Sequence, residues 1–497
     1  MVFSSNVFLF LFLPLFLGLY YLSPARYRNL LILIGSYTFY AWWRVDFLLL
    51  FMAVTLWNYV FGLRIFAAGV RSPAARRWLA WGVVGNLATL GYFKYANFGV
   101  ANINAVLEAA GMEPFVITHV ILPIGISFYI FQSISYLIDV YRADTEPTEN
   151  LINFAAFIAL FPQLIAGPVL RYKDLADQFI ERTHSMEKFS EGASRFMQGF
   201  VKKVFIADSL APLVDHCFAL ANPSTGDAWL GALAYTAQLY FDFSGYSDMA
   251  IGLGLMMGFR FMENFNQPYI SQSITEFWRR WHISLSTWLR DYLYVPLGGN
   301  RHGTFNTYRN LLLTMLLGGF WHGANWTFMV WGAWHGTWLA LERAMGVNAA
   351  PKSLNLSRWA FTLLLVMIGW VVFRAENLDV AWRMYVAMFS FGDWSLSELN
   401  SAQLTSLQIA TLLLAWLVIG FFGIRQFRAQ PLGGAPRTQP EPGANLAYSA
   451  DGALVYQQSG LDALASAATR VALLLLFAAS VLKLSAQSFS PFLYFQF

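Results

Sequence analysis

The sequence predicts an all-α polytopic membrane protein, on three observations. Of its 497 residues, 57% are hydrophobic and 12% are charged, whereas a soluble protein has roughly 45 to 50% apolar and about 25% charged residues. The mean hydropathy is +0.48. The apolar residues gather in successive runs, and because one span takes about 20 of them, the chain has room for about a dozen spans. A soluble multi-domain enzyme is excluded.

The cysteine count and the net charge exclude further classes. The single cysteine, Cys217, leaves no disulfide framework and no cysteine metal cluster. The formal charge of +4 is too small to indicate a nucleic-acid partner. We therefore expect the lipid bilayer as the surroundings, no nucleic acid and no bound metal.

The first apolar run, 7–22, is expected to be a retained span. It has no basic residue before it and no small-residue cleavage site after it. Positive charge next to a span tends to stay in the cytoplasm, so Arg26 and Arg28 place the N-terminus outside and the first loop inside. The same rule places the basic loop around Arg76 inside and the weakly basic stretch 94–118 outside.

The remaining spans follow from the apolar runs, with boundaries that are soft by a few residues. The runs expected to span are 30–43, 47–68, 78–92, 120–141, 228–259, 311–330, 331–342, 359–373, 380–391, 404–422 and 471–484.

The run 151–170 conflicts with the alternation of loops between the inside and the outside of the membrane. A full crossing there would place the basic stretch 171–203 outside the cell. Pro162, Gly167 and Pro168 interrupt this run, and irregular backbone at membrane depth is tolerated where protein or a water-filled cavity covers it. We expect a re-entrant segment, with 171–203 and the basic stretch 260–309 both cytoplasmic; the alternative is one full span followed by a basic external loop.

Three regions follow from the change of composition near the C-terminus. Residues 1–425 form the expected membrane-embedded core. Residues 426–469 are rich in Pro, Gly, Ala, Gln and Ser, which is typical of a flexible linker. Residues 470–497 contain the expected terminal span.

His322 is the first candidate catalytic residue. It lies in an otherwise apolar run after Gly318 and Gly319, whose small size lets another backbone or a ligand approach. A polar residue inside a span is costly, which makes it a functional candidate; the alternative is a core histidine bonded to a carbonyl. His335 is thirteen positions further on, about 20 Å along an unbroken helix and on another face. The two cannot share a metal unless the chain bends sharply.

The second candidate is a polar stretch within an apolar run. Asp242, Ser244, Tyr246 and Asp248 could line a polar channel. Equally, the two carboxylates could cap a helix that breaks at Gly245. The sequence slightly favours a structural role.

The third candidate interleaves arginine with tryptophan. Trp278, Arg279, Arg280 and Trp281 would suit a phosphorylated donor that carries adenine, because guanidinium groups bind phosphates bidentately and indoles stack on flat rings. The alternative is an interfacial amphipathic helix with its aromatic residues among the headgroups.

The candidate residues lie in four long motifs: WHGANW at 321–326, WGAWHG at 331–336, YFDFSGYSDMAIG at 240–252 and EFWRRWHISLSTWLRDYLYVPLGGNR at 276–301. Together these motifs resemble the membrane-bound O-acyltransferase family, and within it the bacterial members that acetylate alginate in pseudomonads. The similarity runs from Met1 to about Phe421.

This resemblance implies a fold and an activity. The implied fold is a ring of transmembrane helices thinned at the centre, with re-entrant and cytoplasmic helices around a central funnel. The implied enzyme is an O-acyltransferase of the bacterial inner membrane. It takes acetyl from a cytoplasmic donor, with acetyl-CoA expected, and passes it to alginate with the help of periplasmic alginate acetyltransferase proteins.

The resemblance also assigns roles to residues. His322 matches the family's intramembrane histidine, and His282 matches a second histidine with a supporting role. A neutral imidazole at the first position can take the proton from an attacking hydroxyl as it meets a thioester carbonyl. Asn325 is a candidate polar support.

Two functional hypotheses remain open at this point. One is an acetyltransferase whose reaction spans the bilayer. The other is a transporter or channel for an activated acyl group or sugar, with the chemistry done by partners. The isolated intramembrane histidine and the absence of visible repeats favour the enzyme.

Overall fold

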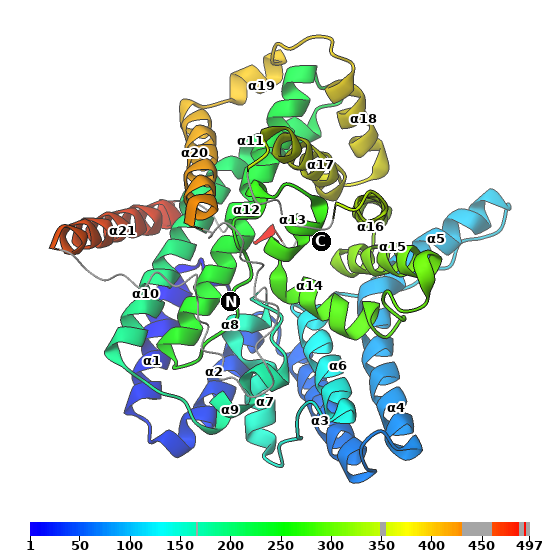
Figure 1. Ribbon diagram of the computed structural model, residues 1–497, viewed down its shortest axis with the longest axis vertical. Coiled ribbons are helices and arrows are strands. Elements are labelled where there is room, and N and C mark those ends of the chain that lie inside the picture. The colour runs from blue at the N-terminus through cyan, green and yellow to red at the C-terminus, as the bar shows by residue number, and fades with distance from the viewer. Residues whose placement is uncertain (166, 348–353, 430–459, 487–491, 494–497) are drawn as a thin grey trace.

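The computed structural model describes residues 1–165, 167–347, 354–429, 460–486 and 492–493. Within these ranges every regular secondary-structure element is a helix, which confirms the predicted all-α class (Figure 1). Four described helices are long and apolar enough to cross a membrane by length and composition: Asp46–Ala67, Leu356–Arg374, Ser406–Arg425 and Ala467–Ala486. Most of the other described helices are shorter than the 18 residues that this measure requires.

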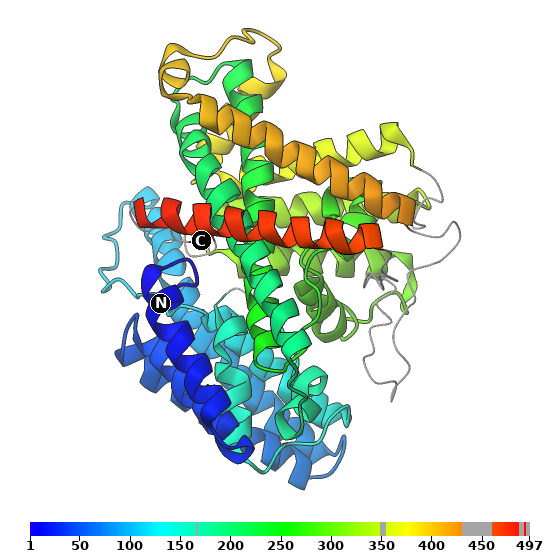
Figure 2. The same cartoon turned by 90° about the vertical axis from the view of Figure 1, so that its left-hand side faces the viewer.

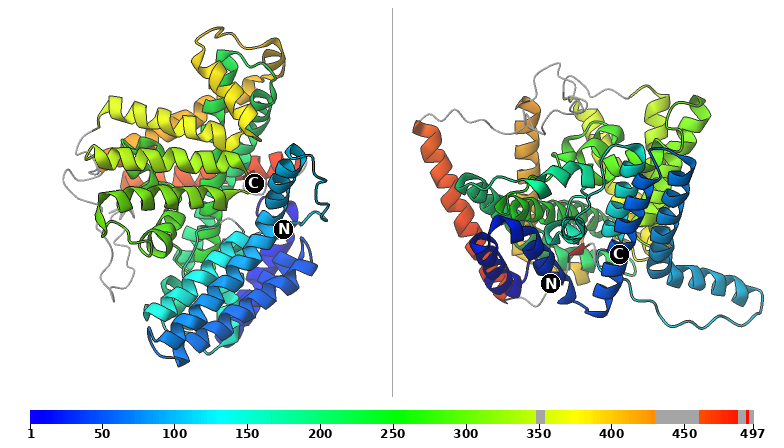
Figure 3. Two further views of the ribbon diagram at one scale, coloured as in Figure 1. Left: turned by 90° about the vertical axis from the view of Figure 1, so that its right-hand side faces the viewer. Right: turned by 90° about the horizontal axis from the view of Figure 1, so that it is seen from below.

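The first five predicted spans correspond to helices within a few residues. They are η1 with α1 (Phe8–Phe12 and Leu13–Leu22), α2 (Arg28–Ala41), α3 (Asp46–Ala67), α4 (Pro73–Leu90) and α6 (Ile126–Arg142). The fifth span starts late, because Gly125 adopts a left-handed conformation with φ of 74° immediately before α6. Between α4 and α6, η3 (Gly91–Tyr95) leads into α5 (Ala96–Ala109), which projects away from the body of the molecule (Figure 3).

The run 151–170 is not one continuous helix. Helix α7 (Leu151–Ala159) ends at Leu160, and the four-residue helix α8 (Phe161–Leu164) follows. At 1.5 Å per residue, nine residues cover only about 14 Å, less than half of the hydrocarbon thickness. The described residues from Phe154 to Leu170 are buried in protein, the condition under which irregular backbone is tolerated at membrane depth.

Helix α12 (Thr225–Met256) runs through the centre of the molecule (Figure 1). It is continuous over 32 residues, which excludes the alternative in which the aspartates cap a helix broken at Gly245. Small residues serve here to bring helices together. A Cβ added at Gly252 would lie 2.5 Å from the carbonyl oxygen of Gly192, and one at Gly245 would lie 2.7 Å from that of Gly199. Glycine pairs therefore set the close approach of α12 to α10.

Helix α10 (Met186–Phe200) begins a run of elements around α12. It is preceded by α9 (Tyr172–Ile180) and followed by η4 (Val201–Ala207) and α11 (Asp208–Ala219). Of all the pairs of elements, α10 and α12 pack most extensively. The stretch 171–203 was expected to be a basic cytoplasmic surface, but several of its cations turn inward toward α12.

The predicted boundary between the spans 311–330 and 331–342 is wrong. The structure has α15 (Gly303–His322) and α16 (Trp326–Ala344), so the chain turns at Gly323–Asn325 and not at Val330. Gly323 is extended and the Asn325 side chain accepts a hydrogen bond from the Thr327 backbone, which starts a new helix. The two helices form a tight hairpin, in which a Cβ on Gly319 would lie 3.2 Å from the backbone of Gly332.

Two short helices join α12 to this hairpin, and five further helices follow the hairpin. The joining helices are α13 (Ile274–Arg280) and α14 (Ile283–Leu289), with η5 (Pro268–Ile270) before them and η6 (Arg290–Tyr294) after them. The closing helices are α17 (Leu356–Arg374), α18 (Leu378–Phe389), α19 (Glu398–Gln403), α20 (Ser406–Ala429) and α21 (Gly460–Ala486). Figure 2 shows α20 and α21 along the outside of the helical body.

The predicted linker lies largely outside the described residues. Helices α20 and α21 reach into it at its two ends, to Ala429 and from Gly460. The α21 side chain Lys483 donates a hydrogen bond of 2.8 Å to the carbonyl of Val204 in η4, so the terminal helix is attached to the core.

We expect the stretches 171–203 and 260–309 to face the cytoplasm. In a Cys217→Ser background, cysteines at the exposed positions Glu187 and Thr304 should resist a membrane-impermeant thiol reagent applied from the periplasmic side. Glu113→Cys, in the stretch expected outside, is the matched control and should be labelled. Labelling of Glu187→Cys from that side would contradict the re-entrant segment.

Candidate active site

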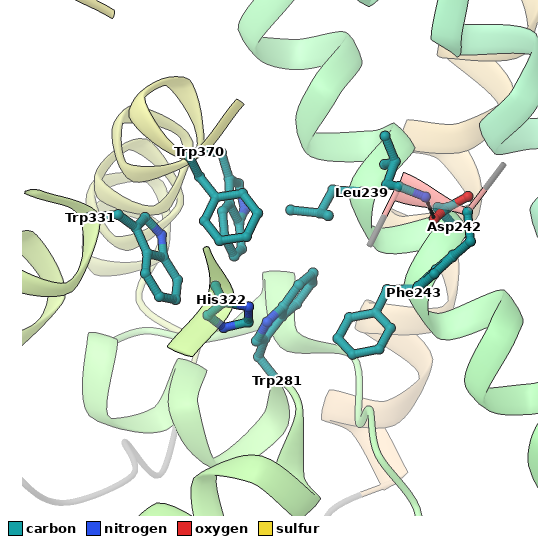
Figure 4. Close-up of a pocket in the computed structure, with 10 residues that line it drawn as sticks. Leu239, Asp242, Phe243, Trp281, His322, Trp331 and Trp370 are labelled. Atoms are coloured by element: carbon teal, nitrogen blue, oxygen red, sulfur yellow. Dashed lines mark hydrogen bonds between the residues drawn. The ribbon is translucent and has the colours of Figure 1, made fainter. Parts of the chain in front are cut away.

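A pocket at the centre of the molecule contains His322 (Figure 4). The space not filled by atoms is about 380 Å³, which includes the part that is open to the outside. Its lining is mostly aromatic, and it combines residues from α12, the α13–α14 corner, the α15–α16 hairpin, α17 and the C-terminal end. The lining residues are Leu239, Asp242, Phe243, Trp281, His322, Trp331, Trp370, Phe373, Phe492 and Leu493.

His322 is the last residue of α15 and is held by rings on several sides. Its ring centroid lies 5.2 Å from that of Trp331 and 5.3 Å from that of Phe373, both edge to face. Trp321 lies 5.0 Å away. The side chain is 7% exposed. The helix end places the imidazole at the pocket wall, and the aromatic rings fix its orientation.

Lys94 supports this helix end, and the sequence analysis missed it. It had been placed at the start of an external stretch, but the structure buries it. Its ammonium donates hydrogen bonds to the carbonyls of Trp321 and His322, the latter at 3.2 Å, and to the Ser127 hydroxyl at 3.2 Å. These use its three N–H donors. A cation at a helix C-terminus is favourable for the last carbonyls. The one available signal was a lone lysine among Tyr92, Phe93 and Tyr95.

Asn325 does not contact His322 in any of the hydrogen bonds of the described residues. Its oxygen accepts from the Thr327 backbone at 3.1 Å and its amide donates to the carbonyl of Glu376 at 2.8 Å. It therefore starts α16 and attaches the hairpin to the end of α17. Asn325 was expected to support His322 directly. In the structure it instead stabilises the turn that follows His322.

His335 is closer to the site than expected. Because the chain turns after His322, the ring of His335 lies 5.0 Å from Trp331, the same indole that contacts His322. The Trp278 indole donates a hydrogen bond of 3.3 Å to His335 Nδ1. The expectation of an unbroken helix was wrong. Among the described residues, no group of three or more His, Cys, Asp and Glu side chains could hold a metal ion.

His282 lies beside the pocket, at the corner between α13 and α14. It is fully buried and its backbone is left-handed, with φ of 44°. Its ring meets Phe243 edge to face at 4.7 Å and lies 6.5 Å from Trp321. Its Nδ1 is 3.0 Å from the side-chain oxygen of Asn264. The structure thus brings together the two histidines that are 40 positions apart in the sequence.

The four polar residues of α12 divide into different roles. Asp242 lines the pocket and forms a buried ion pair of 2.6 Å with Lys203. Asp248 pairs with Arg195 at 2.8 Å and with Lys202 at 2.6 Å. Neither Ser244 nor Tyr246 is among the pocket-lining residues, and Tyr246 stacks on Phe3 at 4.6 Å. Of the predicted channel residues, only Asp242 faces the pocket, and both carboxylates are neutralised by cations of α10 and η4.

The C-terminal end contributes to the pocket, which the sequence analysis did not foresee. Phe492 and Leu493 are buried. The backbone N–H of Leu493 donates to the Asp242 carboxylate at 3.1 Å, and Phe492 packs on Tyr246 at 4.8 Å. Phe492 and Leu493, which composition alone assigned to a separate terminal segment, therefore line the pocket at the centre of the molecule.

The predicted donor cluster is not one surface. Trp278 and Trp281 are buried in the aromatic core, and Trp281 lines the pocket. Arg280 is also buried; it pairs with Glu276 at 2.9 Å and donates to the carbonyl of Asn266 at 3.1 Å. Arg279 is exposed. The helix period, which separates neighbours by about 100°, sends these consecutive side chains in different directions.

Together, the fold and the pocket define a helical membrane protein built around a buried histidine. The sequence profile of MBOAT, the membrane-bound O-acyltransferase family, matches residues 143–377. The chain is 74% identical to a protein of Azotobacter vinelandii named "probable alginate O-acetylase" and 72% identical to one so named in Pseudomonas aeruginosa, with both chains fully covered in each comparison. It is 37% identical to a peptidoglycan O-acetyltransferase of Helicobacter pylori over 80% of this chain and 82% of that one.

The chain therefore belongs to the membrane-bound O-acyltransferase family. It is a membrane-embedded acyltransferase, and the alternative of a transporter or channel without its own chemistry is set aside. The matched region extends from the end of α6 to just beyond α17 and contains both histidines of the site.

We predict that Lys94→Met lowers both the rate of acyl transfer and the stability. The change leaves the carbonyls of Trp321 and His322 without their cation, and hydrogen bonds to a charged group are each worth about 1.5 to 3 kcal/mol. Transfer assays and thermal unfolding of the purified protein in lipid measure the two effects. Lys188, which donates to the carbonyl of Gly258 at 2.5 Å and does not line the pocket, is the matched control; Lys188→Met should affect stability alone. Equal transfer rates for Lys94→Met and the wild type would refute the role.

Proposed function

We propose that the protein is a bacterial inner-membrane O-acetyltransferase that takes acetyl from cytoplasmic acetyl-CoA and passes it across the membrane for the O-acetylation of alginate. The observation that carries the proposal is the burial of His322 in a pocket at the centre of a helical membrane protein. The full-length relatives named as alginate O-acetylases support the choice of acyl group and polymer.

His322 is the general base of the proposed reaction. The oxygen of an acceptor hydroxyl forms a bond to the thioester carbonyl carbon, and the carbon–sulfur bond of the donor breaks. The hydroxyl proton goes to the imidazole and from there to the departing thiolate, so the histidine returns to its starting state. A positioned base contributes roughly 10² to 10⁴-fold to such a step.

A site in the middle of the membrane fits the separation of the two substrates. Coenzyme A is cytoplasmic and highly charged, so it cannot cross hydrocarbon, whereas the polymer is outside. Two funnels that meet at His322 would let the donor and the acceptor approach from opposite faces. Periplasmic alginate acetyltransferase proteins are the proposed partners that carry acetyl onward to the polymer.

Arg279 is the proposed contact for the phosphates of the donor. It is the one exposed side chain of the Trp278–Trp281 cluster, and a guanidinium suits phosphate recognition. The ring-stacking role that the sequence suggested for Trp278 and Trp281 is not carried forward, because their burial supports a role in the core.

The catalytic assignment predicts that His322→Ala abolishes acetylation of the polymer in cells while the protein stays inserted at normal abundance. The proposed role of the imidazole is proton transfer. Its side chain lies at the end of α15, at the wall of the pocket, so its loss should not prevent the helix from forming. Polymer-bound acetyl and membrane abundance are the measurements. His119→Ala, which removes an exposed histidine of the external stretch, should behave as wild type. Normal acetylation by His322→Ala would remove the basis of the proposal.

The donor assignment separates two neighbouring arginines. Arg279→Gln should raise KM for acetyl-CoA with little change in kcat, because a contact remote from the acetyl group binds ground state and transition state alike. Arg280→Gln should instead lower the thermal stability, since it leaves Glu276 and the Asn266 carbonyl without their partner. Steady-state kinetics and thermal unfolding in lipid distinguish the two. An unchanged KM in Arg279→Gln would place the donor elsewhere, with the stretch 171–203 as the next region to test.

A further inference from the structure

Asn264 links α12 to the corner that carries His282. It is fully buried in the segment between α12 and α13. Its Nδ2 donates to the Ser247 hydroxyl on α12 at 2.9 Å. Its Oδ1 faces His282 Nδ1 at 3.0 Å, the Ser284 hydroxyl at 2.9 Å and the Ser284 backbone N–H at 3.2 Å. All of the polar atoms of this amide are therefore in use.

The surrounding donors fix which atom of the amide faces His282. A backbone N–H can only donate, so the atom that meets the N–H of Ser284 is the oxygen. The Ser284 hydroxyl supports the same assignment of the amide oxygen. It accepts a hydrogen bond of 2.9 Å from the backbone of Val169 and donates its own proton to Asn264. An amide oxygen accepts and cannot donate, so His282 must carry its proton on Nδ1.

A neutral imidazole carries one proton, so this tautomer leaves a lone pair on Nε2 of His282. That nitrogen is buried and has no hydrogen-bond partner among the residues that the structure describes. The ring of His282 contacts Phe243, which lines the His322 pocket. His282 is not one of the residues that line the pocket, but its ring packs directly against the pocket wall at Phe243.

The backbone at His282 is strained in a way that supports a functional role. Its φ of 44° and ψ of 55° are left-handed, a conformation that L-residues with a Cβ rarely adopt. The N–H of the next residue, Ile283, donates to the Asn264 carbonyl at 2.9 Å, which holds the corner in place. Such strain persists where the surrounding structure enforces it, and it clusters at functional sites.

We propose that Asn264 is a positioning residue that holds His282 with its proton on Nδ1, so that Nε2 accepts a hydrogen bond from the ligand in the His322 pocket during acyl transfer. This inference rests on the proposed function, because it takes that pocket as the reaction centre. It assigns His282 one definite role, that of a hydrogen-bond acceptor, and it makes Asn264 part of the machinery although Asn264 touches no substrate.

The tautomer can be observed without any activity. Nitrogen NMR of the full-length protein in lipid, labelled with isotopic nitrogen in histidine, gives the His282 signals by difference from His282→Gln. The expected result is a protonated Nδ1 with a bare Nε2 in the wild type. Asn264→Asp, which keeps the oxygen acceptor, should retain this tautomer, and Asn264→Leu should lose it. A proton on Nε2 in the wild type would overturn the proposal.

The kinetic arm separates positioning from folding. Release of coenzyme A from acetyl-CoA by the protein in lipid should fall in kcat by about 10²-fold in Asn264→Leu, the lower end of what a positioned proton acceptor contributes, with KM nearly unchanged. Asn264→Asp should recover most of the loss. The matched control is Asn86→Leu, which removes another buried asparagine, bonded to Asn58 at 2.7 Å on the far helices α3 and α4. A loss equal in Asn264→Leu and Asn86→Leu would reduce Asn264 to a packing residue.

The two claims fail in different ways. If His322→Ala keeps full activity, the proposed function fails whatever the tautomer of His282. If His322→Ala is inactive but Asn264→Leu releases coenzyme A at the wild-type rate, only the positioning role fails.

Discussion

Asp242 and Asp248, the two carboxylates in the middle of α12, impose the constraint on which the centre of the molecule depends. Charged groups inside a membrane protein are costly unless they are paired. Asp242 and Asp248 obtain their partners from α10 and η4, whose Lys203, Lys202 and Arg195 turn inward. The pairing requires close helices, and facing glycines of α10 and α12 provide that approach. The charges and the glycines thus depend on each other, and together they hold the wall of the pocket.

His322, the proposed catalytic residue, is positioned by a helix that ends inside the protein. A helix end leaves carbonyls without partners, and at His322 the ammonium of Lys94 satisfies them. Asn325 then starts the next helix, and aromatic rings from α16 and α17 confine the imidazole. His282 is held in an analogous way by Asn264 at a strained corner. Two of these polar side chains, Lys94 at His322 and Asn264 at His282, lie outside the four sequence motifs.

The sequence was sufficient for the fold class, the family and the approximate positions of the long apolar helices, because long apolar runs and local motifs carry that information. It was insufficient wherever contacts between distant residues decide. The turn at Gly323–Asn325 was missed because it takes only three residues and apolar helices lie on both sides of it. Lys94 looked like the start of a loop, since nothing local shows that its partners lie more than 220 positions away. Tertiary packing also brings Leu493 to Asp242. It likewise buries Arg280 while leaving Arg279 exposed.

The proposed route of acetyl through the His322 pocket can be tested by a transfer assay that keeps the two sides of the membrane separate. The purified protein would be placed in sealed lipid vesicles with radiolabelled acetyl-CoA on its cytoplasmic face and the periplasmic partner proteins with alginate on the other face. If acetyl takes this route, label should reach the polymer only when His322 is present, while coenzyme A stays on the donor side. Label that appears only on the donor side, or transfer that is unchanged in His322→Ala, would contradict it.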